Sequence, residues 1–332
     1  RRQRQMCIRD SIEGVQAPLH HDFENLWDSP AEMRALFQKL GWRRVVAFQT
    51  SKPMHRLQHD ITLKVAKELQ ANILLHPSVG MTKPGNLHYY ARVHCYQAIR
   101  RHYPHHMAVL SLLPSAVRMA GPREVLLNAI MRQNYGCSHM IVGPEHSAPP
   151  GVRDEAKRFY PRYAAQEMME RHQNDLAIRM VPVQELCYAS DTEVFVPSDP
   201  ENKHCIRFTD KDLKHHLERN QEIPAWYSYP EVIAALRKVY PPRNRKGITL
   251  FFTGLSGSGK STLAKILYAK FIEEGSRPVT LLDGDVVRLN LSSELGFSRE
   301  HRNINVRRIA FVASEITKNG GIAICAPIAP YT

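Results

Sequence analysis

The chain has 332 residues, enough for two or more domains, and its 43% of hydrophobic residues is ordinary for a globular protein. No apolar run approaches the ~20 residues that a membrane-spanning helix needs, so we expect no membrane association. The net charge of +13 suits anionic ligands. We expect no nucleic-acid partner, because the sequence has no dense Lys/Arg block and no recognisable nucleic-acid-binding motif.

The six cysteines are scattered along the chain and include no C-x-x-C pair. This spacing predicts reduced thiols and a cytoplasmic protein rather than a disulfide framework. None of the 17 histidines has the spacing of a structural zinc site, so we expect no such site.

Helices and strands are predicted to alternate over the first part of the chain. The predicted helices are Pro30–Leu40, Asp60–Leu69, Tyr90–Arg100 and Pro122–Asn134. The predicted strands are Arg44–Phe48, Asn72–His76, His106–Leu112 and His139–Val142. This alternation predicts a Rossmann-like α/β domain, a parallel sheet with crossover helices. Ligands in such sheets bind beyond the carboxyl ends of the strands.

A second domain is predicted after a less regular, more polar stretch that runs from about Asp175 to Tyr240. Residues 241–246 form a linker of proline and charged residues with no apolar period. The 86 residues that remain, 247–332, supply about three strands. We therefore expect this second α/β domain to be incomplete in the chain.

The second domain opens with a run that fits the phosphate-binding template G-x-x-x-x-G-K-[ST]. Its residues are Gly254, Leu255, Ser256, Gly257, Ser258, Gly259, Lys260, Ser261 and Thr262. A short apolar strand precedes the run, and a helix with an apolar stripe follows it up to Gly275. This context predicts an ATP site in which Lys260 reaches the β- and γ-phosphates and the Ser261 hydroxyl ligates Mg²⁺.

Two carboxylates follow the next predicted strand, Val279–Leu282, in the run Asp283-Gly284-Asp285. At the carboxyl end of a strand beside a phosphate loop, one carboxylate can hold Mg²⁺ or its water shell. The other can accept the proton of an attacking hydroxyl. The structural alternative is an Asp-Gly turn without chemistry.

Five motifs in the second domain resemble adenylylsulfate (APS) kinase and occur in that family's order. They are Gly254–Thr262, Asp283–Arg288, Leu295–Ser298, Arg302–Ile309 and Ala326–Tyr331. The resemblance implies a kinase with a phosphate-loop fold. It implies transfer of the γ-phosphate of ATP to the 3′-hydroxyl of adenosine 5′-phosphosulfate, which gives PAPS.

The same resemblance implies roles for individual side chains. Arg288, Arg302 and Asn305 would hold the phosphosulfate and the sugar, because planar guanidinium groups suit such anions. Phe297 would stack on the adenine, and Ile328 would pack near it.

Catalysis is assigned by resemblance to the two aspartates. Asp285 would orient or deprotonate the 3′-hydroxyl, with Asp283 as the alternative. For the neighbouring arginines the competing interpretation is a solvated helix face, favoured for Arg308 and open for Arg307. Many relatives have serine at the position of Ala329, which here carries no hydroxyl.

The region from about 20 to 240 resembles ATP sulfurylase. The motifs are Gly41–Thr50, Leu74–Gly85, Arg118–Glu124, Asn134–Cys137 and Ile223–Trp226. We expect residues 1–240 to form this region, with a nucleotidyltransferase core at about 20–180 and a smaller domain at about 181–240. Together with 247–332, the chain resembles a bacterial ATP sulfurylase–APS kinase fusion.

The sulfurylase motifs are altered. The family pattern Q-x-R-N-P-x-H-x-x-H reads with Ser51 in place of its arginine, Lys52 in place of its asparagine and Gln58 in place of its second histidine. His59 comes one residue late, about 100° away around a helix. In the second motif, G-R-D-H-A-G, Pro144 replaces the arginine.

These changes predict an APS kinase with a silent sulfurylase region that serves as a homo-oligomerisation or regulatory scaffold. Removing one group that stabilises the transition state costs about 3–4 kcal/mol, and several are altered together. Two alternatives stay open, a bifunctional PAPS synthetase and a nucleotide-sensing scaffold. A relocated sulfurylase mechanism would use Lys52, Arg56 and His59.

Overall fold

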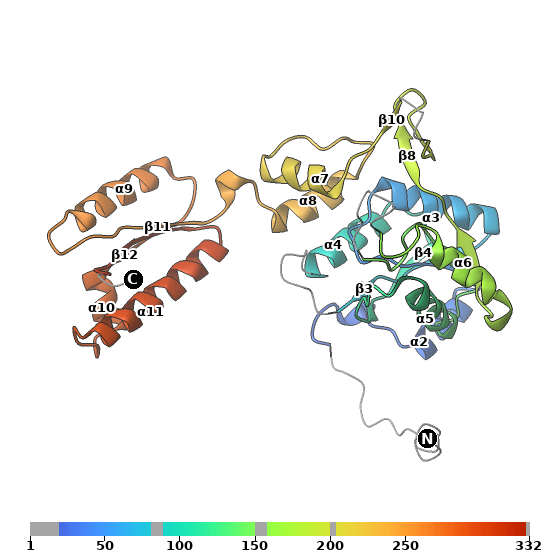
Figure 1. The fold of residues 1–332 in the computed structure, drawn as a ribbon, viewed down its shortest axis with the longest axis horizontal. Coiled ribbons are helices and arrows are strands. Elements are labelled where there is room, and N and C mark those ends of the chain that lie inside the picture. The colour runs from blue at the N-terminus through green and yellow to red at the C-terminus, as the bar shows by residue number, and fades with distance from the viewer. Residues whose placement is uncertain (1–19, 81–88, 150–157, 200–203, 330–332) are drawn as a thin grey trace, which may run out of the picture. The chain divides into compact units, whose positions relative to one another are not determined.

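The computed structural model describes residues 20–80, 89–149, 158–199 and 204–329 (Figure 1). The chain divides into two compact units. The first contains Arg1–Phe208 and Pro224–Leu236, and the second contains Thr209–Ile223 and Arg237–Thr332. The ends of two sequence motifs, residues 81–85 and 330–331, lie outside the described residues. Within the described ranges, no helix has both the length and the apolar character to cross a membrane.

A parallel sheet of five strands in the order β4-β2-β1-β6-β7 forms the centre of the first unit. The strands are β1 (Val45–Phe48), β2 (Asn72–Leu75), β4 (Ala108–Leu110), β6 (His139–Val142) and β7 (Arg179–Pro182). The predicted parallel α/β core is confirmed. β4 begins later than predicted because His106 has a φ of 59°, outside the extended region. It ends before Leu112, whose N–H donates to the Leu26 carbonyl at 2.7 Å.

One helix precedes β1, and further helices connect the strands of this sheet (Figure 1). They are α2 (Pro30–Lys39), α3 (Arg56–Leu69), α4 (Tyr89–Arg100), α5 (Gly121–Asn134) and α6 (Ala164–Arg171). α2 begins at Ser29, whose hydroxyl accepts the Glu32 N–H while the Glu32 carboxylate accepts the Ser29 N–H. Helix and strand side chains share a core around Val125, Met140 and Ile178.

Smaller elements complete the first unit. Short 3₁₀ turns occur at Glu24–Leu26 and Gln173–Asp175, β3 (Ser78–Val79) pairs with β5 (Leu113–Pro114), and β8 (Leu186–Ala189) pairs with β9 (Val194–Pro197) and β10 (Cys205–Ile206). Cys187 and Cys205 form a disulfide between β8 and β10, with Cα atoms 5.6 Å apart. The prediction that the thiols are reduced is wrong for this pair. The antiparallel pairing of β8 with β10 brings the two cysteines together, and their spacing in the sequence did not predict that pairing.

The second unit is built on a parallel sheet in the order β11-β13-β12. Its strands are β11 (Ile248–Phe251), β12 (Val279–Asp283) and β13 (Ile322–Ala326). The helices are α7 (Asp210–Glu218), α9 (Lys260–Glu274), α10 (Gly284–Leu291) and α11 (Arg299–Lys318), with a 3₁₀ turn at Arg243–Arg245. α8 (Pro230–Val239) contains residues of both units. The strand–loop–helix order places the phosphate-loop motif between β11 and α9, as predicted.

Candidate active site

The loop between β11 and α9 has the backbone that the glycine template predicts. Gly254, Gly257 and Gly259 have φ angles of 139°, 80° and 86°, which side chains rarely adopt. A Cβ atom at Gly254 would lie 2.7 Å from the Ser258 hydroxyl, so a side chain here would displace that of Ser258. Lys260 is buried, and its ammonium donates to the Leu255 carbonyl across the loop at 2.6 Å.

The first turn of α9 lies directly behind this loop. Its N-cap is Gly259, which has no side chain to accept from the first N–H groups, and the turn contains no acidic residue. The unpaired N–H groups and the positive end of the helix dipole together favour a bound phosphate. Ser261 and Thr262 occupy the second and third positions of the helix. The geometry therefore fits a polyphosphate with Lys260 beside it.

The two aspartates lie where β12 meets α10. Asp283 caps α10, because its Oδ1 accepts the N–H of Asp285 at 3.1 Å. Its Oδ2 is buried and has no hydrogen-bond partner among the described residues, whereas Asp285 is exposed. A Cβ atom at Gly284 would lie 3.3 Å from Pro327, so the turn packs against the segment after β13. The two aspartates therefore form a capped turn in which one carboxylate is buried and the other is exposed.

Arg288, Phe297 and Arg302 come together as a cluster. The Cζ atom of Arg288 lies 4.4 Å from the centre of the Phe297 ring, and that of Arg302 lies 5.7 Å from it. The Phe297 side chain is 71% exposed, so the ring has a face open to a ligand. Arg288 from α10 and Arg302 from α11 also donate to backbone carbonyls around the ring.

The remaining predicted residues take different places. Asn305 on α11 is buried, and its Oδ1 has no partner among the described residues. Ile328 is 39% exposed in the segment after β13. Arg308 donates to the Glu294 carboxylate at 2.6 Å and braces the turn after α10, which favours a structural role. Arg307 is exposed on α11.

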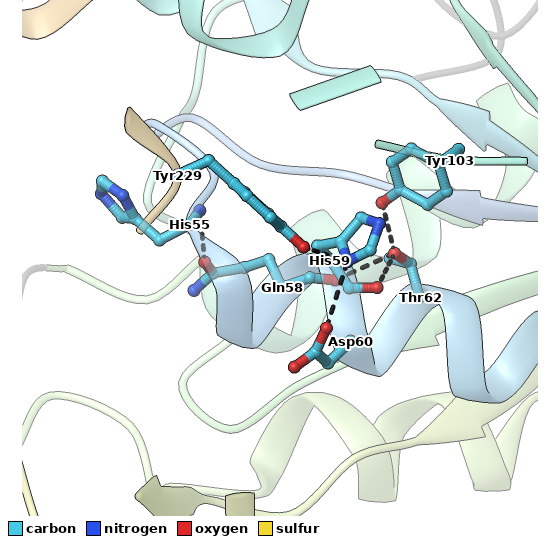
Figure 2. Close-up of polar contacts among 7 residues, drawn as sticks. All are labelled: His55, Gln58, His59, Asp60, Thr62, Tyr103 and Tyr229. Atoms are coloured by element: carbon cyan, nitrogen blue, oxygen red, sulfur yellow. Dashed lines mark hydrogen bonds and ion pairs between the residues drawn. The ribbon is translucent and has the colours of Figure 1, made fainter. Parts of the chain in front are cut away.

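In the first unit, the altered motif forms a loop between β1 and α3. The backbone carbonyls of Ser51 and Lys52 accept from Arg92 and Tyr96 of α4, each at 2.7 Å. Gln58 accepts the N–H of His55 at 2.8 Å and so caps the start of α3 (Figure 2). This cap explains why α3 begins earlier than predicted. It also commits the Gln58 side chain to the helix.

The late histidine, His59, points into the first unit. It is 4% exposed, its ring lies 4.5 Å from that of Tyr103, and its Nδ1 lies 3.1 Å from Asp60 and 3.0 Å from the Tyr229 hydroxyl (Figure 2). Arg56 lies over the Tyr229 ring, with its Cζ 4.2 Å from the ring centre. These contacts hold both side chains within the fold, while His59 Nε2 and Arg56 Nε are buried without a hydrogen-bond partner among the described residues.

Three histidines in the sulfurylase motifs have environments that the sequence did not predict. His55 shares a hydrogen bond of 2.8 Å with Ser228, which lies far along the chain. Burial, and then the charge of Arg132, hold the pKa of His76 well below its usual range. The same two causes lower the pKa of His146 to about 4. Sequence analysis placed His76 in the Leu74–Gly85 motif and His146 in the motif that contains Pro144, but it assigned no role to either side chain.

Two family models match the chain. The ATP-sulfurylase model matches residues 24–239, and the adenylylsulphate kinase model matches residues 246–332. Curated relatives include the sulfate adenylyltransferase of Phaeosphaeria nodorum, 46% identical over 99% of this chain and 57% of the relative. The sulfate adenylyltransferase of Aspergillus terreus is 48% identical over 98% of this chain and 57% of the relative. The chain thus spans somewhat more than half the length of these relatives.

A solved structure, the hexameric APS kinase from Thiobacillus denitrificans, is similar to the chain over both units. The TM-score is 0.79 and the identity 45%, over 95% of this chain and 60% of that one. The predicted order of an α/β sulfurylase region followed by a phosphate-loop kinase domain is therefore confirmed. The predicted domain boundaries, 1–240, 241–246 and 247–332, stay predictions. The curated relatives named above are fungal, so they do not show the predicted bacterial origin.

Proposed function

The chain belongs to the ATP-sulfurylase family and continues into an adenylylsulfate kinase domain, and we propose that this domain phosphorylates the 3′-hydroxyl of APS with ATP. The observation that carries the proposal is the phosphate loop with buried Lys260, followed by a carboxylate pair and an exposed aromatic ring between two arginines. These groups match the three needs of the reaction, which are a polyphosphate site, a group at the attacking hydroxyl and an anion site.

ATP would bind with its phosphates against the N-terminus of α9. The backbone N–H groups of Gly257–Thr262 would surround the β- and γ-phosphates, with Lys260 balancing their charge. Because phosphoryl transfer needs little covalent help from the protein, this positioning and charge stabilisation would supply most of the rate enhancement.

The residues present fit a magnesium ion. The Ser261 hydroxyl and the buried, unpartnered Oδ2 of Asp283 are hard oxygen donors of the kind that Mg²⁺ prefers. When bound, the ion would neutralise charge on the ATP phosphates. Kinase sites commonly hold Mg²⁺ with one or two protein oxygens plus phosphate oxygens, so this small donor set is sufficient.

APS would bind over Phe297, with its adenine on the exposed ring. Arg288 and Arg302 would hold the phosphosulfate, and Asn305 would hydrogen-bond the sugar through its unpartnered amide oxygen. The exposed carboxylate of Asp285 would then orient the 3′-hydroxyl and accept its proton. Incubating the full-length protein with APS and γ-labelled ATP tests the proposal, because the label must appear in PAPS.

Sulfate adenylylation by the first unit is a second candidate activity. The curated relatives, matched over nearly the whole chain, are named sulfate adenylyltransferase, which supports a bifunctional enzyme better than a silent first unit. The silent alternative draws support from the contacts of Gln58, Arg56 and His59, which are engaged within the fold. The Thiobacillus protein, which is named an APS kinase and is matched over both units, also supports that alternative.

We also propose that the protein forms a homo-oligomer through its sulfurylase region. The similar Thiobacillus protein is described as hexameric, which supports assembly of several identical chains. Light scattering on the full-length protein tests this, and a monomer at micromolar concentration would refute it.

The remaining alternative, a nucleotide-sensing scaffold, would bind ATP and APS without forming PAPS. The cytoplasmic location stays a prediction.

A further inference from the structure

The peptide groups around Gly296 are held by three side chains from two helices. The Gly296 N–H donates to Nδ1 of His301 at 2.8 Å, and its carbonyl accepts from Arg288 at 3.1 Å. Arg288 also donates to the Leu295 carbonyl at 2.7 Å, and Arg302 to the Phe297 carbonyl at 2.9 Å. Of these contacts, the one through His301 is the only one in which the side chain is the acceptor.

His301 lies at the third position of α11, in the first turn after the N-cap Ser298. Its own N–H donates to the Ser298 hydroxyl at 3.2 Å, while its ring reaches back to Gly296. This resembles a capping box, in which the third residue of a helix secures the chain just before it. A Cβ atom at position 296 would lie 3.2 Å from His301 Nδ1, so glycine permits the close approach.

Accepting an N–H fixes the chemical state of the His301 ring. Nδ1 must carry no proton, so the ring is neutral with its hydrogen on Nε2. Protonation turns Nδ1 into a donor that faces another donor, and the contact is lost. The charged groups around this turn are Glu294 and, from α10 and α11, Arg288, Arg302 and Arg308. The pKa of Glu294 is lowered first by its backbone hydrogen bond and then by Arg308, and a protonated His301 would lower it further.

We propose that His301 is a positioning residue that holds the Gly296–Phe297 backbone, so that APS binding weakens when the ring is protonated. This inference rests on the proposed kinase function and extends it to a residue that does not itself touch the substrate. Because Phe297 lies between Arg288 and Arg302, a shift of its backbone moves the ring away from both guanidinium groups. The lost hydrogen bond corresponds to a weakening of APS binding of about 3- to 10-fold.

Three substitutions separate the acceptor from the size of the ring. His301→Asn places an amide oxygen close to the position of Nδ1 and does not titrate. His301→Gln moves the acceptor one bond further out, and His301→Ala removes it. His215→Asn, at an exposed position of α7, is the matched control for replacing one histidine in the second unit.

The measurement is the dissociation constant of APS by calorimetry, without ATP, on the full-length proteins between pH 5.5 and 8.5. We expect the unsubstituted protein and His215→Asn to bind APS more weakly at acid pH. His301→Asn should bind equally well across the range, and His301→Ala and His301→Gln should bind weakly at every pH. In kinetics at pH 8, His301→Ala should raise KM for APS by about 3- to 10-fold with kcat nearly unchanged.

A pH profile of His301→Asn that matches the unsubstituted protein would overturn the inference. So would tighter APS binding on acidification, which would mean that the imidazolium attracts the substrate. In both cases kinase activity of the unsubstituted protein would leave the proposed function intact. If the unsubstituted protein neither binds APS nor forms PAPS, the proposed function itself is refuted.

Discussion

Asp283 accepts the backbone N–H of Asp285 on one carboxylate oxygen, 3.1 Å away, and keeps its other oxygen buried without a partner among the described residues. The relationship makes Asp283 both the cap of α10 and an inward-facing oxygen donor. Asp285 is held by this cap with its own side chain exposed. These different environments support the proposed division of tasks, with Asp283 at a metal ion and Asp285 at the attacking hydroxyl.

Substituting each aspartate by asparagine should separate these tasks. Asp285→Asn should lower kcat by about 10²-fold with little change in KM for APS, because it removes the group at the hydroxyl. Asp283→Asn should raise the Mg²⁺ concentration needed for half-maximal rate, because an amide is a weaker ligand. Steady-state kinetics at varied Mg²⁺ checks both. An effect of Asp285→Asn on the Mg²⁺ requirement alone would contradict this assignment.

Phe297→Ala should raise KM for APS by about 10-fold or more, since a stacked base contributes about 1–3 kcal/mol. The KM for ATP should stay close to that of the unsubstituted protein. Phe311→Ala is the matched control, because Phe311 is similarly exposed, at 67% against 71%, on α11. Equal effects of the two substitutions on KM would show that Phe297 has no special role in binding.

The free energy of unfolding of the first unit should fall as the pH drops below about 6.5. Burial lowers the pKa of His146 to about 4 and that of His76 well below its usual range. The unfolded chain therefore takes up these protons first, and stability is lost between the unfolded and folded pKa values, by up to about 3 kcal/mol for His146. Urea unfolding at pH 5 and 7.5 measures this, and His146→Gln should reduce the difference. An equal pH dependence in both proteins would contradict it.

If the first unit is active, the full-length protein should form ATP from APS and pyrophosphate. His55→Ala should abolish this reaction and leave PAPS formation intact, because His55 retains the motif position while Gln58 does not. Production of PAPS but no ATP by the unsubstituted protein would restore the silent alternative. In that case Ser51→Arg alone should not recover the activity, since Lys52, Gln58 and Pro144 remain.

The sequence predicted those parts of the fold whose signals are local. Each of these signals specifies the backbone of a single element. Examples are the glycines of the phosphate loop, the apolar runs of β1 and β6, and Gly275 at the end of α9. Contacts between distant segments had no such signal. The Cys187–Cys205 disulfide depends on how β8 pairs with β10, and the His55–Ser228 hydrogen bond joins residues 173 positions apart.

The candidate kinase site shows the same division. The residues Arg288, Phe297 and Arg302 were predicted from motifs, and the structure brings them together. The contact of His301 with Gly296 was not foreseen, because it depends on a ring nitrogen reaching back across a turn. The motif predicted which residues lie in the site. The role of His301 in holding the backbone of the motif could be seen only in the structure.

Formation of PAPS from APS and ATP by the full-length protein tests the central claim most directly, with Lys260→Ala beside the unsubstituted enzyme. Lys260 lies across the phosphate loop, and its loss should lower the rate at least about 10²-fold while leaving the thermal unfolding temperature nearly unchanged. Lys265→Ala, exposed on the same helix, should retain the rate. No PAPS from the unsubstituted enzyme, or equal rates in both variants, would contradict the kinase assignment.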